Sequence, residues 1–77
     1  EALEAGGSAG AVLNAANEVA VAQFLDGSLP FLGIADVIAR TLENMEHVAH
    51  PSLDDIVAID ADARRVAADL ITHRQLA

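Results

Sequence analysis

Asn14, Asn17 and Glu18 are the residues of this chain whose types and spacing could do chemistry. In a helix, Asn14 and Glu18 lie on one face, and apolar side chains such as Leu25 continue that face. We therefore expect all three to be partly buried, and a buried amide or carboxylate needs a hydrogen-bond partner. Gln23 falls on the far side of the same helix and is expected to face solvent. The pattern indicates a structural polar cluster that fixes helix packing.

A catalytic alternative makes Glu18 a metal ligand or a general base. That role requires a second carboxylate, a histidine or a metal partner, and the sequence places none beside it. No glycine-rich phosphate loop follows a strand pattern, and no serine has a histidine and an acid at a recognisable spacing. We predict no catalytic, cofactor-binding or metal-binding residue in this chain.

Asp60 interrupts the apolar stripe of a later helical segment, with Arg64 one turn further on. An unpaired, ionised Asp inside a fold costs several kcal/mol, so a partner or exposure is required. The partner is either Arg64 on the same helix or, through a charge-assisted contact across the bundle, Asn14 or Asn17. Both arrangements are structural, and Asp60 is assigned to the same polar cluster.

His47 and His50 are spaced like a pair of metal ligands but lie in a predicted loop beside Pro51. Only Glu43 and Glu46 are near enough in sequence to complete a site. Zinc sites need three or four rigidly held ligands, so no metal site is predicted here.

The first helix needed to hold these residues is predicted over 8–26. Ser8 is a suitable N-cap, and Gly27 a suitable stop. Residues 1–7 resemble the end of a preceding, truncated helix, closed by Gly6 and Gly7.

Two further helices complete the prediction, over 33–46 and 53–73. Apolar residues recur at offsets of three and four in both. Ser52, followed three residues later by Asp55, is predicted to form a capping box at the start of the last helix. The fold class is all-α, a small bundle of three main helices plus the end of a preceding, truncated one, in a single domain over 1–77.

Composition excludes several classes of function. The 77 residues include no cysteine, and 12 acids against 4 basic residues give a net charge of −8. Such a charge repels nucleic acid and anionic membranes, and no apolar run reaches the roughly 18 residues that span a bilayer. We expect no nucleic-acid or membrane partner and place the chain in the cytoplasm.

The longest distinctive run, residues 13–27 (LNAANEVAVAQFLDG), is followed by residues 31–35 (FLGIA). Together they resemble the helical C-terminal domain of 1-deoxy-D-xylulose 5-phosphate reductoisomerases. Residues 52–56 and 60–67 resemble the last helix of that domain, and residues 1–7 resemble the end of its opening helix. The chain departs from the family at Gly33, where an acidic or other capping residue is common.

The resemblance implies a parent oxidoreductase of the non-mevalonate pathway of isoprenoid biosynthesis. That enzyme converts 1-deoxy-D-xylulose 5-phosphate to 2-C-methyl-D-erythritol 4-phosphate with NADPH and a divalent metal, Mg or Mn. The family's nucleotide, metal and phosphate sites belong to earlier domains, so no site residue is carried over. The resemblance therefore implies a non-catalytic scaffold, whose partners are the catalytic and NADPH-binding domains of the same chain.

Two other classes of function stay open. An acyl carrier protein needs a modifiable serine at a helix start, and both Ser28 and Ser52 precede a leucine, but neither follows the aspartate of the carrier motif. A free-standing acidic helical interaction module is the other alternative. Because the opening helix is truncated, we also expect the isolated fragment to cover its open face by self-association as a dimer.

Overall fold

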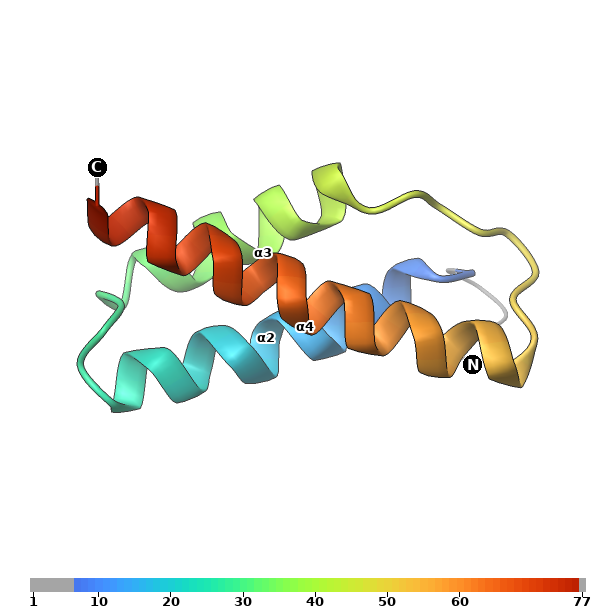
Figure 1. The fold of residues 1–77 in the computed structure, drawn as a ribbon, viewed down its shortest axis with the longest axis horizontal. Coiled ribbons are helices and arrows are strands. Elements are labelled where there is room, and N and C mark those ends of the chain that lie inside the picture. Colours follow the sequence, from blue (N-terminus) through green and yellow to red (C-terminus); the bar gives the residue numbers. More distant parts are fainter. Residues whose placement is uncertain (1–6, 77) are drawn as a thin grey trace.

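The computed structural model describes residues 7–76, which form three helices: α2 (Ala9–Leu25), α3 (Gly33–Asn44) and α4 (Leu53–Leu76). α2 and α4 run in the same direction and pack against each other, and α3 runs in the opposite direction alongside both (Figure 1). No strand occurs within these residues, which confirms the predicted all-α bundle. The truncated helix predicted before Gly7 lies outside the described residues. Among residues 7–76, no helix has the length and apolarity needed to cross a membrane.

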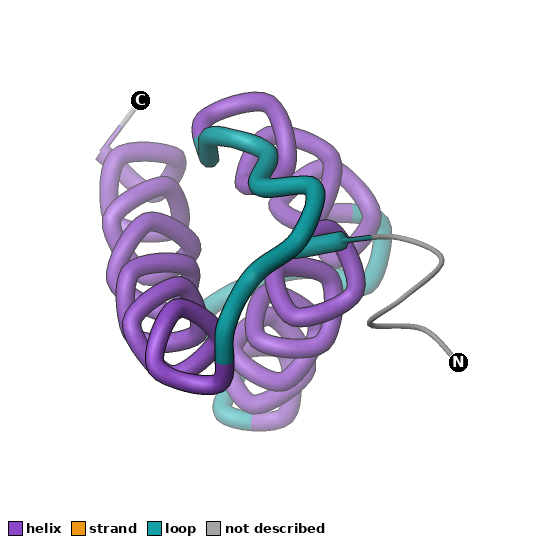
Figure 2. The backbone as a smooth tube through the Cα atoms, turned by 90° about the vertical axis from the view of Figure 1, so that its right-hand side faces the viewer, coloured by secondary structure: helices purple, strands orange, loops and turns teal. Residues whose placement is uncertain are grey.

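The core is built from small aliphatic side chains. Seen along the bundle axis, the helices surround a common centre (Figure 2). One buried cluster joins all three helices, and a second lies mainly between α2 and α4. The buried apolar residues are Val12, Ala15, Ala16, Ala20, Leu29, Val37, Ala63, Ala67 and Ile71. Because alanine dominates the faces of α2 and α4, these two helices can approach each other closely.

The turn from α2 to α3 is closed by backbone hydrogen bonds. Gly27 adopts a φ of 90°, and its N–H donates to the Phe24 carbonyl at 3.1 Å. The Ser28 N–H donates to the Gln23 carbonyl at 2.9 Å, which completes a Schellman motif. Leu29 then inserts into the core, where it is buried. The predicted stop at Gly27 is thus confirmed, with its physical reason in the left-handed backbone.

α3 begins at Gly33 without a side-chain cap and ends two residues before the predicted boundary. The chain becomes extended at Met45, whose side chain packs against the buried cluster between α2 and α4. Thr41 is the buried polar residue of α3, and its hydroxyl donates to the Val37 carbonyl at 2.7 Å. That bond satisfies the hydroxyl within its own helix.

At the opposite end of the bundle, the start of α2 is attached to the α3–α4 loop. The Ser8 N–H donates to the Val48 carbonyl, and the Val48 N–H donates to Ser8 Oγ, both at 2.8 Å. The prediction that Ser8 caps α2 with its side chain is wrong, because this buried hydroxyl is engaged by the loop instead. Gly7, with φ 56°, lies so close that an added Cβ would stand 2.5 Å from the Val48 carbonyl oxygen.

The start of α4 follows the prediction. The Asp55 N–H donates to Ser52 Oγ, and the Ser52 N–H donates to Asp55 Oδ2, both at 3.0 Å. This reciprocal pair is the predicted capping box with Asp in place of Glu.

Candidate functional site: a polar network between α2 and α4

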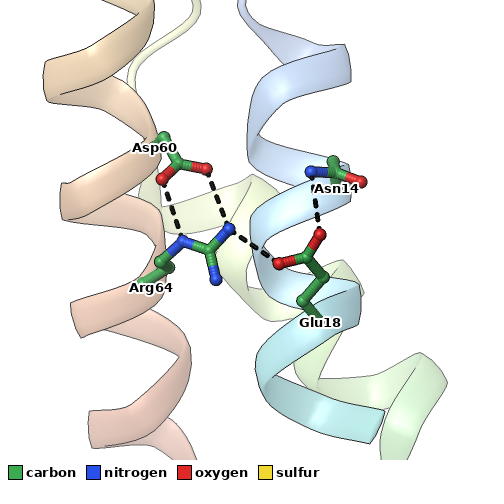
Figure 3. A network of polar contacts seen from close by, with 4 residues as sticks. All are labelled: Asn14, Glu18, Asp60 and Arg64. Atoms are coloured by element: carbon green, nitrogen blue, oxygen red, sulfur yellow. Dashed lines mark hydrogen bonds and ion pairs between the residues drawn. The ribbon is translucent and has the colours of Figure 1, made fainter. Parts of the chain in front are cut away.

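The candidate site lies at the exposed edge of the contact between α2 and α4. Ala15 and Ala63 are buried where the two helices meet. Since α2 and α4 run in the same direction, Glu18 and Arg64, each close in sequence to one of those alanines, come to lie opposite one another (Figure 3). The small core residues therefore determine which polar side chains can meet above them.

Arg64 is the centre of a network of four residues. Its Nε donates to Asp60 Oδ2 at 2.9 Å, and its Nη2 lies 3.3 Å from Asp60 Oδ1. The same Nη2 donates to Glu18 Oε1 at 2.8 Å, across the helix interface. Asn14 Nδ2 completes the chain with a long bond of 3.4 Å to Glu18 Oε2. One guanidinium thus links carboxylates from two helices, which is the planar, multi-donor geometry that Arg favours.

The network is partly exposed to solvent, which limits its contribution to the stability of the fold. The side chains of Arg64 and Glu18 are 39% and 54% exposed. Hydrogen bonds to Asp60, and secondarily to Glu18, raise the pKa of Arg64 above its ordinary value, so this side chain remains a cation. Exposed ion pairs stabilise proteins weakly, so the network orients α4 against α2 more than it stabilises the fold.

The predicted polar cluster is assembled only in part. Asn14, Glu18 and Asp60 all join the network, whereas Asn17 is exposed and makes no side-chain hydrogen bond with the described residues. The expectation that Asn14, Asn17 and Glu18 are partly buried is wrong, since all three are exposed. Gln23, expected in solvent, is half-buried.

The physical reason is that α2 is apolar on two sides. Its alanine side, which includes Ala16 and Ala20, packs on the other helices, while the side that carries the larger Leu13 is left exposed. A prediction that assigns the larger apolar residues to the core therefore selects the wrong side of α2. The close contact with the other helices requires small residues instead.

For Asp60, the structure selects the first of the two partners considered. Asp60 pairs with Arg64 on its own helix, and Asn14 reaches Glu18 rather than Asp60. The bond between Arg64 and Glu18 was not predicted. The spacing of Asp60 and Arg64 by four residues gave the direction of Arg64, but only the parallel packing of α2 and α4 brings Glu18 within its reach.

The polar side chains of the site are used mainly to bind one another. Both acids are engaged by Arg64, which leaves neither as a free base. Within residues 7–76, no three His, Cys, Asp or Glu side chains gather in a way that could hold a metal ion. What the geometry does is join two helices that are far apart in the sequence.

Comparison with known proteins places the chain in a family. The family model described as the DXP reductoisomerase C-terminal domain matches residues 1–66. The chain belongs to this family. The matched region includes both helices of the network, α2 and the part of α4 that carries Asp60 and Arg64.

Named relatives support the same assignment. The domain is 54% identical over 71 residues, 92% of its length, to 1-deoxy-D-xylulose 5-phosphate reductoisomerase of Bacteroides thetaiotaomicron. It is 57% identical over 67 residues, 87% of its length, to the protein of that name from Acidithiobacillus ferrooxidans. It is 52% identical over all 77 residues to that from Dechloromonas aromatica. The domain spans 18%, 17% and 19% of these relatives. The carrier-protein and free-standing-module alternatives find no support in these matches.

Proposed function

We propose that this chain is the scaffold domain of a 1-deoxy-D-xylulose 5-phosphate reductoisomerase. The parent protein converts 1-deoxy-D-xylulose 5-phosphate to 2-C-methyl-D-erythritol 4-phosphate, an oxidoreductase step of isoprenoid biosynthesis in the cytoplasm. The observation that carries the proposal is the family match over residues 1–66, together with relatives that bear this name at 52–57% identity.

NADPH and a divalent metal, Mg or Mn, belong to the proposed parent reaction, and the described residues do not fit the metal. The two acids of the polar network, Glu18 and Asp60, both bind Arg64. No described trio of ligating side chains converges. The proposal therefore assigns both groups to the catalytic and NADPH-binding domains of the same polypeptide, and no step of the reaction to this chain.

The scaffold role follows from what the network and core can do. Arg64 fixes α4 against α2, and the link between Ser8 and Val48 fixes the start of α2 against the α3–α4 loop. A domain fixed in this way can present a constant surface to its neighbours, which helps to position a reacting site elsewhere in the chain.

The test is activity of the whole protein that contains this chain. NADPH oxidation that depends on both 1-deoxy-D-xylulose 5-phosphate and Mg²⁺ or Mn²⁺ is the expected result, and absence of turnover would refute the proposal. The isolated 77-residue chain should bind neither NADPH nor Mn²⁺ in calorimetric titration. Saturable binding with a dissociation constant below about 10 µM would reveal a site of its own.

The isolated chain is also proposed to form a dimer, because the described residues leave one apolar side of α2 exposed. Leu13 is about half exposed there. Sedimentation equilibrium at a few tens of micromolar should then report about twice the 8.0 kDa chain mass. Extending the chain at its N-terminal side should shift the equilibrium toward monomer. A strictly monomeric chain with a cooperative melt would contradict the proposal.

A further inference from the structure

Large apolar side chains lie exposed around the turn that joins α2 to α3. Leu25, Phe31 and Leu32 are 77%, 68% and 84% exposed, and the ring of Phe24 contacts that of Phe31 edge to face at 5.7 Å. We call these four residues the apolar apex. Exposed apolar groups that lie together mark interaction surfaces, whereas isolated ones need no explanation.

The apolar apex is held in place by ordered structure. The Schellman motif at Gly27 fixes one side of the turn, and the Gly33 N–H donates to the Pro30 carbonyl at 2.8 Å on the other side. Between them, Leu29 is buried in the core. The exposed side chains therefore project from a rigid turn, and a partner would pay little entropy to bind them.

The charged residues of the chain indicate which kind of partner could bind the apolar apex. Each arginine whose side chain is described is already paired with an acid: Arg40 with Asp36, Arg64 with Asp60 and Glu18, and Arg65 with Asp62. The sequence contains no lysine, and Asp26 stands exposed within the turn itself. In a two-fold pair this surface would meet itself, so Asp26 of one copy would lie near Asp26 of the other with no free described arginine to offset the repulsion, which disfavours a second copy here.

We propose that the apolar apex is the surface on which another domain of the same polypeptide docks, through an apolar patch rimmed by basic side chains that face Asp26. The relatives are long enough to contain such a domain, because this chain spans only 17–19% of their length. The inference rests on the proposed function only in placing the chain inside a longer protein.

Photo-cross-linking in the full-length protein tests this directly. A benzophenone amino acid replaces Phe31, and in a matched protein it replaces Leu53, which is 77% exposed on α4 and lies outside the apolar apex. Position 31 should cross-link to residues outside 1–77 of the same chain. A mixture of heavy- and light-isotope protein distinguishes these from cross-links between two copies.

A second substitution measures how much the apolar apex contributes to docking. Leu32→Asp should lower the yield of the position 31 cross-link about tenfold, since a buried leucine contributes binding energy of that order. Leu53→Asp should leave the yield unchanged. Equal yields from positions 31 and 53, cross-links only within residues 1–77, or cross-links only between copies would each overturn the inference. Reductoisomerase turnover, assayed on the same unsubstituted protein, reports separately on the proposed function.

Discussion

The two ends of the bundle are closed by different kinds of interaction. At the end where α2 begins, buried polar bonds join Ser8 to Val48, and Gly7 packs against the backbone of the α3–α4 loop. At the α2–α3 end, local backbone bonds and the buried Leu29 close the turn, and large apolar side chains remain outside. The first end is joined by long-range polar bonds, whereas the second is closed by local bonds and carries the apolar apex. The difference shows that one small bundle can close its two ends by long-range bonds at one and local bonds at the other.

The glycines with positive φ give the strongest test of this difference, with one at each end. Gly7→Ala should destabilise the fold by about 2–4 kcal/mol, because a left-handed alanine is strained and its Cβ also meets the Val48 carbonyl. Gly27→Ala should cost only about 1–2 kcal/mol, since no atom lies within 4 Å of an added Cβ there. Urea unfolding at one fixed protein concentration measures both. Equal losses would show that the Gly7 contact has no energetic importance.

The next effect in size concerns the two serines near the α3–α4 loop. Ser8→Ala should destabilise the fold by about 1–2 kcal/mol, because the Val48 N–H loses its acceptor in a buried setting. Ser52→Ala removes only an exposed capping bond and should cost about 0.5–1 kcal/mol. If the order of the two losses is reversed, Ser8 is less important than its burial indicates.

A smaller effect is expected at the polar network. Arg64→Ala should lower the urea midpoint by less than Ser8→Ala, because the network is exposed, and Arg65→Ala should leave the midpoint unchanged. Salt at about 1 M should remove most of the Arg64 effect by screening. An effect of Arg65→Ala as large as that of Arg64→Ala would mean that bridging two helices adds nothing to a local pair.

The smallest effect is predicted for Asn17→Ala, which should change stability by no more than about 0.5 kcal/mol. Asn17 is exposed and has no hydrogen-bond partner among the described side chains. A loss of 1 kcal/mol or more in the same urea experiment would indicate a contact that the fold of the single chain does not contain.

The sequence predicted the helices better than their contacts. Apolar spacing, Gly27 and the pair Ser52 and Asp55 depend on local geometry, and local geometry is what a sequence pattern encodes. The choice between the two apolar sides of α2 depends on how closely α4 can approach, which no local pattern contains. The same holds for Ser8, whose residue type suits a helix cap equally well. Its true partner, Val48, lies 40 residues away and is brought near only by the loop.

The link between Ser8 and Val48 also has a mechanical consequence. Tension applied to the chain ahead of Gly7 would reach the α3–α4 loop through two hydrogen bonds before it could unwind α2 from its first turn. A force applied at Gly7 should therefore move α2 and the α3–α4 loop together.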